Sequence, residues 1–267
     1  IDQENTFIPR VSRDLTAVTV IAKRGFAKLG GDMEAFRYEP ETGQRSAVTP
    51  LPEAPAGFVS MRSSDDQRHA FFTSEVPASK GIVDIAGSLS GVVSVMPDES
   101  PLSCLVQLPN VFVDTPASHV VSADGRRFFF SPITCEQGLY MREAAPNGDL
   151  RAGSGAKTTL ISGPPIAGPD EGGQFLQAAA DGSWVFFLTS NKLDPDDGNS
   201  TADVYRYTVG GSKECITCAV PEADVAGGPE IEGGQSTKSV AVAETGERVY
   251  FTSFQALADG ATAGSRN

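Results

Sequence analysis

Short, continuously apolar runs recur along the chain, and each follows a polar turn. The stretch "VSADGRRFFFSP" (121–132) places an Asp-Gly pair before three phenylalanines, and "AADGSWVFFLTS" (179–190) has the same arrangement. Related stretches are "SSDDQRHAFFTS" (63–74), "AETGERVYFTS" (243–253) and, more weakly, "SRDLTAVTVIAK" (12–23). A serine near the end of the run recurs at intervals of 57, 59 and 63 residues. This regular interval indicates an internal structural repeat.

Each repeat predicts four short strands, which we call a, b, c and d. The apolar run is strand b. A strand such as "SHVVSA" or "KSVAVA" precedes it, and "DVYRY", "EAFRY" or "GLYMR" follows it as strand c. Strand d is "RSAVT", "SCLVQL", "TTLIS" or "ECITCAV". An Asp-Gly pair between apolar runs indicates a tight hairpin, because twist-matched turns need positive φ. A b strand without polar alternation is typical of a strand covered on both faces.

These features predict an all-β fold, a β-propeller of four-stranded antiparallel blades with about four and a half blades visible. The alternative is a β-sandwich of short strands, which does not need a regular four-strand period. We expect a single partial propeller domain over residues 1–267, and we expect it to be a fragment of a larger propeller. The predicted blades span 7–52, 57–109, 117–163 and 174–220, with an incomplete blade at 236–267.

The stretches "SADGRRFFFSP" and "DVYRYTVGG" resemble the repeats of TolB-type, WD40-like β-propellers. In that family a Ser-Pro-Asp-Gly turn precedes an apolar strand, and an Asp-(Ile/Val)-Tyr strand follows. The resemblance covers almost the whole chain and implies the class of propeller found in large bacterial surface and secreted proteins. This chain has Ala or Asp where the family usually has Pro, and longer connections after strand b. The resemblance therefore implies the fold and does not transfer a particular TolB role.

The predicted loops divide into two sets. The a–b and c–d turns define a tight-turn face, with one longer, Gly-rich exception, "PNGDLRAGSGAK" (146–157). The b–c loops and d–a links define a long-loop face. Binding residues are concentrated on loops held by a rigid scaffold, so the long-loop face is the expected binding face. Its long segments are 75–91, 109–117, 163–173, 191–202 and 219–235.

The charge of the chain limits the classes of partner that it is expected to bind. The formal net charge of −13 disfavours nucleic acid and anionic lipid as partners. The longest apolar run, "WVFFL" (184–188), has the length of a strand, so no membrane insertion is expected. Acidic residues gather on the long-loop face and predict a site for a basic partner, although acidic loops that only keep a secreted protein soluble are the favoured alternative. They are Asp170, Glu171, Asp194, Asp196, Asp197, Glu222, Asp224, Glu230 and Glu232.

Two motifs raise the question of metal. "LDPDDGNSTADVY" (193–205) offers oxygen ligands for calcium from Asp194, Asp196, Asp197, Asn199 and Asp203. Its spacing departs from an EF-hand, and a turn whose side chains satisfy local backbone N–H groups is the favoured alternative. "CITC" has the spacing of a zinc knuckle but no second ligand pair, so a local Cys215–Cys218 disulfide or free thiols are expected. No other cofactor is predicted. Whether Cys104 and Cys135 pair stays open.

No catalytic residue is predicted. Neither His69 nor His119 belongs to a visible Ser-His-Asp grouping, and "PNGDLRAGSGAK" lacks the Gly-Lys-Ser/Thr ending of a phosphate loop. The sequence predicts a non-catalytic interaction module, extracellular, periplasmic or at the cell surface, that binds protein or glycan through its long acidic loops. One alternative is the accessory propeller of an enzyme, such as a serine peptidase, whose catalytic domain lies outside this segment. Another is a metal- or sugar-processing propeller that acts at its own acidic loops. The oligomeric state stays open.

Overall fold

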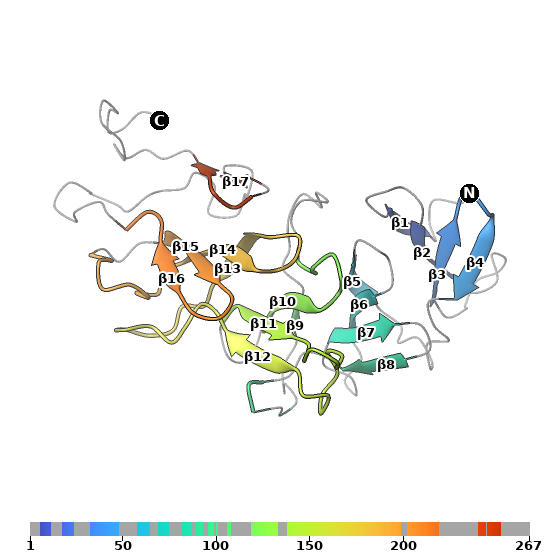
Figure 1. The fold of residues 1–267 in the computed structure, drawn as a ribbon, viewed down its shortest axis with the longest axis horizontal. Coiled ribbons are helices and arrows are strands. Elements are labelled where there is room, and N and C mark those ends of the chain that lie inside the picture. Colours follow the sequence, from blue (N-terminus) through green and yellow to red (C-terminus); the bar gives the residue numbers. More distant parts are fainter. Residues whose placement is uncertain are drawn as a thin grey trace.

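Eighteen β-strands and the turns between them make up the described part of the chain in the computed structural model. The described residues are 6–11, 18–23, 33–47, 58–64, 69–74, 82–86, 89–92, 96–98, 100, 106–107, 119–132, 138–198, 202–218, 240–243 and 245–251. The strands form four four-stranded sheets and one two-stranded sheet, with every paired strand antiparallel. Figure 1 shows the sheets following one another in chain order along an arc. The chain is thus an all-β propeller, as the repeat predicts.

All four four-stranded sheets run in chain order, and each is one blade. The first blade holds β1 (Thr6–Val11), β2 (Val18–Lys23), β3 (Met33–Glu39) and β4 (Gln44–Ala47). The second holds β5 (Phe58–Ser63), β6 (His69–Ser74), β7 (Ile82–Ala86) and β8 (Leu89–Val92). The fourth holds β13 (Gln174–Ala178), β14 (Trp184–Thr189), β15 (Asp203–Thr208) and β16 (Lys213–Cys215). A hairpin of β17 (Val240–Val242) and β18 (Val249–Phe251) begins a fifth.

The third blade corrects two predictions. It contains β9 (Val106–Gln107), β10 (Arg127–Pro132), β11 (Tyr140–Glu143) and β12 (Lys157–Leu160). The segment "SCLVQL", predicted as the last strand of the second blade, instead supplies β9, which pairs with the end of β10. The last strand of the second blade is β8, which forms a short hairpin with β7 where the loop 75–91 was predicted.

The innermost pairing of the third blade is shared between two segments. The predicted strand "SHVVSA" contributes one isolated bridge, between Val121 and Phe128 near the start of β10. Farther along β10, Ser131 and Pro132 pair with β9. Because β10 is six residues long, both short segments can hydrogen-bond to it in sequence.

The b strands lie between neighbouring blades. Phe128 and Phe129 of β10 are fully buried and point to opposite faces of the sheet. The Phe128 ring lies 5.1 Å from Phe71 in the second blade, and the Phe129 ring lies 5.3 Å from Phe175 in the fourth. Burying one such side chain contributes about 2–3 kcal/mol. The continuously apolar run is therefore covered on both faces, as its sequence indicates.

The a–b corners share one geometry in three blades. The backbone N–H of the corner glycine donates to the carbonyl three residues earlier at Gly125, Gly182 and Gly246, over 2.8–2.9 Å. These glycines have φ of 69°, 69° and 70°. Positive φ is confined to the glycine of each corner, because a four-residue connection built on a turn of this kind needs one left-handed residue.

The corners also stack from blade to blade. A Cβ atom added to Gly125 would lie 2.3 Å from the His69 ring, and one added to Gly246 would lie 2.3 Å from the Trp184 ring. One added to Gly182 would lie 2.9 Å from Cδ of Arg127. In each case the side chain is the first residue of strand b in the preceding blade. We call this series of contacts the corner stack.

Among the described residues, no helix is long and apolar enough to cross a membrane.

Candidate functional site

The first candidate site is a hollow of about 430 Å³ between the third and fourth blades, which we call the long-loop hollow. It opens where β10 and β14 end and where β11, β13 and β15 begin, which is the face predicted to carry the long loops. Its lining is a mixture of hydroxyl, amide, carboxylate and backbone groups with the aliphatic side chains of Pro132, Leu188 and Ala202. The lining includes Ser131, Glu171, Gly172, Gln174, Leu188 and Ser190.

One buried asparagine holds the wall of this hollow. Asn191 is 1% exposed, and its Nδ2 donates to the Ser162 carbonyl and to Oδ1 of Asp170, each over 2.7 Å. Its Oδ1 accepts the backbone N–H of Glu171 over 2.7 Å. Asn191 therefore fixes the link between the third and fourth blades from the loop that follows β14. A buried amide satisfied on both sides gives the hollow a defined wall.

A lysine from β16 supports the same link. The Lys213 ammonium donates to the Gly163 carbonyl. Burial lowers the pKa of Lys213 below its ordinary value of 10.5, and the charge of Asp170 opposes that shift. Asp170 is thus held by Asn191 and stabilises a half-buried cation, while its neighbour Glu171 is exposed at the hollow.

The predicted calcium loop uses its carboxylates locally. Oδ1 of Asp194 accepts the backbone N–H of Asp196 over 3.0 Å. Asp197 is 5% exposed, and its Oδ2 accepts the Tyr205 hydroxyl over 2.7 Å. Asp203 is fully buried and accepts the Thr217 hydroxyl. These bonds support the alternative of a turn that satisfies its own polar groups.

No three of these four carboxylates come within ligand distance of one another in the described part of the chain. Asn199, the fifth predicted ligand, lies outside the described residues, as do Glu222, Asp224, Glu230 and Glu232 of the predicted acidic face. The calcium site and the basic partner of that face stay predictions.

The cysteine pair lies at the end of β16: Cys215 is the last residue of the strand and Cys218 follows it. Cys215 and Cys218 are joined in a disulfide with their Cα atoms 5.6 Å apart. Ligand atoms of Asp203, Cys215 and Cys218 lie within 4.8 Å of one another. A disulfide offers no thiolate, which is the form that binds metal, so this group is not a metal centre in the oxidised chain. Burial, followed by the hydrogen bond to Asp197, raises the pKa of nearby Tyr205 well above 10.

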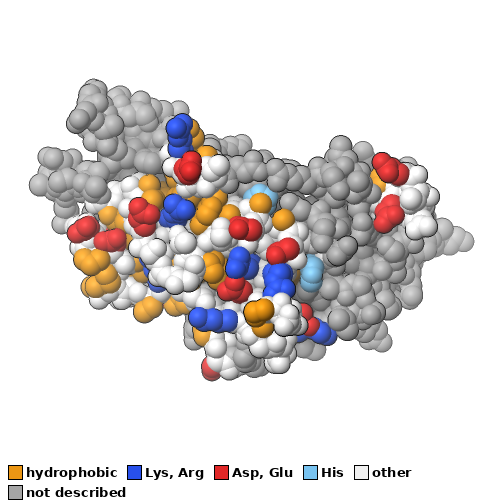
Figure 2. Space-filling model, viewed as in Figure 1, with side chains coloured by type: hydrophobic (Ala, Val, Ile, Leu, Met, Phe, Trp, Pro, Cys, Tyr) orange, Lys and Arg blue, Asp and Glu red, His pale blue; other side chains and the backbone are white. Residues whose placement is uncertain are grey.

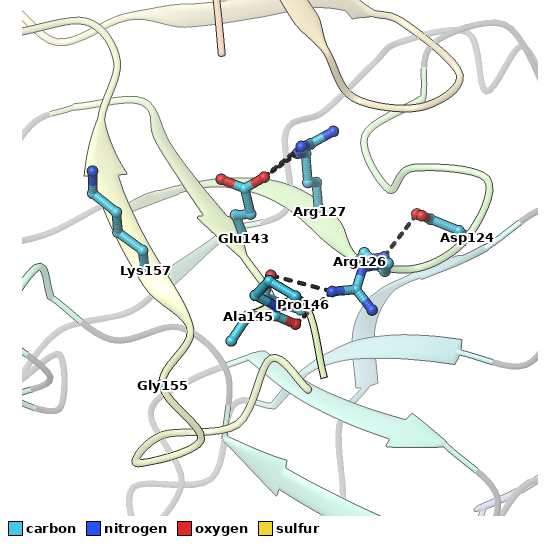
Figure 3. Close-up of a pocket in the computed structure, with 9 residues that line it drawn as sticks. Asp124, Arg126, Arg127, Glu143, Ala145, Pro146, Gly155 and Lys157 are labelled. Carbon is cyan, nitrogen blue, oxygen red and sulfur yellow. Dashed lines mark hydrogen bonds and ion pairs between the residues drawn. The ribbon is translucent and has the colours of Figure 1, made fainter. Parts of the chain in front are cut away.

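The second candidate site lies on the tight-turn face of the third blade, and sequence reasoning missed it. It is a hollow of about 500 Å³, which we call the basic hollow, and Figure 3 shows its wall. Acidic and basic side chains are interleaved over the middle of the described surface in Figure 2. In the basic hollow the cations outnumber the anions by three to two. They are Arg126, Arg127 and Lys157 against Asp124 and Glu143.

A cross-strand row forms one side of the basic hollow. Glu143 of β11 lies opposite Arg127 of β10 and, on its other side, opposite Lys157 of β12. Arg127 forms an ion pair with Glu143, with Nε donating to Oε1 over 2.8 Å. Arg127 also donates from Nη1 to the Asp181 carbonyl in the fourth blade over 2.8 Å. The Arg127 guanidinium is therefore already paired within the chain and is less available to a ligand.

A buried arginine holds the other side, which is the loop between β11 and β12. Arg142 is 0% exposed, and its Nε donates to the Leu150 carbonyl over 2.5 Å. Its Nη1 donates to the Thr158 hydroxyl over 2.8 Å, and its Nη2 to the Arg151 carbonyl over 3.0 Å. The Gly-rich segment 146–157 is thus an ordered wall of the hollow, because a guanidinium at its base bonds several of its groups.

Comparison with known proteins finds similar solved structures but no matching family. No protein-family description matches the chain, and no curated protein matches it. Among solved structures, TolB from Acinetobacter baumannii is 12% identical with a TM-score of 0.45, over 94% of this chain and 49% of that one. An oligogalacturonate lyase in complex with manganese is 12% identical with a TM-score of 0.49, over 93% and 62%.

The Pseudomonas aeruginosa periplasmic gluconolactonase PpgL is 17% identical with a TM-score of 0.42, over 90% of this chain and 63% of that one. The chain spans less than two thirds of each of these three structures. None of the three TM-scores reaches 0.5, so the propeller assignment rests on the repeated four-stranded sheets described above. The chain is a β-propeller in its fold, and the activities of those proteins remain theirs.

Proposed function

We propose that this chain is a non-catalytic β-propeller module that binds a protein or glycan at its long-loop hollow. The observation that carries the proposal is the Asn191 network. It fixes the hollow wall before any partner arrives, so little entropy is lost on binding. The lining suits hydrogen bonding to sugar hydroxyls or a peptide backbone, because it combines exposed Glu171, Gln174 and Ser190 with aliphatic side chains such as Leu188.

We also propose an oxidising location, extracellular, periplasmic or at the cell surface. The Cys215–Cys218 disulfide supports this, because disulfides persist in such compartments and are rare in a reducing cytosol.

The experiment measures binding of the intact chain to two sets of probes, a hexalysine peptide and an array of neutral oligosaccharides. Glu171→Ala is compared with Glu214→Ala, which removes an exposed glutamate from β16 outside the lining of the hollow. We expect Glu171→Ala to weaken the bound probe and Glu214→Ala to leave it unchanged. Equal effects of the two variants, or no bound probe in either set, would contradict the proposal.

A Glu171→Gln variant separates the two partner classes. A basic peptide needs the negative charge and should lose affinity with this variant. A sugar hydroxyl can form a hydrogen bond with an amide as well as with a carboxylate, so a glycan should keep most of its affinity for this variant.

A further inference from the structure

The basic hollow on the tight-turn face has groups that the folded chain does not use. Nη2 of Arg126 donates to the Ala145 carbonyl over 2.5 Å and to the Ala144 carbonyl over 3.5 Å. These bonds hold the guanidinium in one orientation against the wall of the hollow. An arginine has five N–H donors in a fixed fork, and the bonds made by Nη2 leave another edge of that fork for a ligand.

Lys157 supplies a second cation across the space. In Figure 3 it projects from β12 on the side of the hollow away from Arg126, beyond Glu143. Its side chain is exposed. The ion pairs within the described residues are Arg127–Glu143 and Arg151–Asp149, so Lys157 takes part in neither.

The anions of the hollow are already engaged. Oδ1 of Asp124 accepts the Ser122 hydroxyl over 2.7 Å and the Arg126 backbone N–H over 3.0 Å, so this carboxylate belongs to the turn. Glu143 accepts two donors of Arg127. Asp124 keeps its negative charge, because both of its donors are neutral. Arg126 and Lys157 are the two cations of the lining that take part in no ion pair among the described residues, so the three cations and two anions leave the lining with a net positive charge. The hollow is attractive to an anion although the chain as a whole carries a net charge of −13.

We infer that the basic hollow binds a ligand through a single carboxylate that pairs with the free edge of the Arg126 guanidinium, while Lys157 adds a second positive charge on the far side of the hollow. A planar carboxylate matches the free edge of a guanidinium, and one negative charge suits a site that keeps Glu143 close by. A doubly charged phosphate would meet more repulsion from Glu143 and from the acidic protein around it. The ordered loop 146–157 closes one side of the hollow, so the site is concave and about the size of a short peptide segment.

The carboxylate could belong to an acidic side chain or to a chain terminus, and three peptides distinguish these sources. They are Ac-Gly-Glu-Gly-NH2, Ac-Gly-Gln-Gly-NH2 and Ac-Gly-Gln-Gly-OH. Each is titrated into the intact chain, and binding is followed by backbone amide chemical shifts. We expect the peptide with the glutamate, the peptide with the free terminus or both to shift the resonances of 124–127 and 155–157. The uncharged glutamine peptide should not shift them.

Matched lysine variants test the position. Lys157→Gln should weaken the carboxylate peptide about 2- to 5-fold, the range for one exposed charge pair. Lys192→Gln removes a lysine from the loop after β14 and should leave the affinity unchanged. Arg126→Lys keeps the charge but loses the planar edge, so it should weaken binding too. Its shifts in the absence of peptide show whether the loop wall has kept its structure.

Several outcomes would overturn the inference. They are equal binding of the glutamate and neutral glutamine peptides, equal losses in Lys157→Gln and Lys192→Gln, and stronger binding of inorganic phosphate than of any carboxylate peptide. Binding at the long-loop hollow is unaffected by each of these results, because that site lies on the opposite face.

Discussion

The corner stack predicts that a single methyl group at Gly125 separates neighbouring blades. At Gly125→Ala the new Cβ would lie 2.3 Å from Cδ2 and 2.6 Å from Cγ of His69. A ring cannot yield as the end of a flexible chain does, so either the corner or the second blade must move. Such overpacking costs about 1–3 kcal/mol. The positive φ of 69° adds about 1 kcal/mol for any L side chain.

The chain supplies a matched control for the second of these effects. Gly43 has a φ of 67°, and a Cβ there would meet nothing within 4 Å. Gly43→Ala should therefore cost about 1 kcal/mol through backbone strain alone. Gly125→Ala should cost about 2–4 kcal/mol, and the difference between the two variants measures the contact between blades.

Urea denaturation followed by the fluorescence of the single tryptophan measures both variants. A double variant completes the test, because His69→Ala removes the two ring atoms that the new methyl would strike. We expect Gly125→Ala to cost about 1–2 kcal/mol less in the His69→Ala background. Equal losses at Gly43 and Gly125, or no coupling between Gly125 and His69, would refute the proposed role of the corner stack.

Other predictions concern single side chains. Arg142→Met should destabilise the chain by about 2–4 kcal/mol, since buried acceptors lose their donor. Arg142→Lys should recover little of that loss, which urea denaturation checks. Asn191→Ala should increase hydrogen exchange at 170–172, because the Glu171 N–H loses its acceptor. Asn191→Asp keeps that acceptor but places a carboxylate against Oδ1 of Asp170, so it should increase exchange too; unchanged exchange in both would be contrary evidence. Stability should fall as pH rises above 10, because Tyr205 ionises in the unfolded chain before it does so in the folded one, and Tyr205→Phe should flatten that fall in pH-dependent denaturation. Tyr250→Lys should be nearly neutral because Tyr250 is 58% exposed, whereas Phe186→Lys should prevent folding because Phe186 is 1% exposed; similar melting temperatures would refute this contrast.

The repeat and the buried b strands could be predicted because their signals are local. The Asp-Gly pair predicts the a–b corner, and Phe128, Phe129 and Phe130 directly after it predict a strand covered on both faces. Both signals lie within ten residues. The innermost strand of the third blade could not be predicted in this way. Val106 and Gln107 have no local feature that selects β10 over β7 as a partner, and the choice depends on the three-dimensional arrangement of the blades.

The sites show the same limit. Spacing alone placed Asp194, Asp197 and Asp203 in one candidate calcium loop. It could not indicate that Asp197 turns inward to Tyr205 or that Asp203 turns to Thr217. The basic hollow depends on cross-strand register, which brings Arg127, Glu143 and Lys157 into one row. The charged residue at the first position of β10, Arg127, was a usable signal for this site, because the end of the neighbouring strand β11 must lie beside that position.

The corner stack has a direction, and that direction bears on how the chain is made. In every described case the glycine that covers a side chain comes later in the chain than the side chain itself. During synthesis each of these blades therefore leaves the ribosome before the side chain of the first residue of its b strand is covered. The next corner covers that group some 60 residues later. Gly246 covers Trp184, so Trp184 fluorescence should change when the a–b corner of the fifth blade packs on the fourth blade. Measured on nascent chains of increasing length, this change gives the chain length at which the two blades pack together.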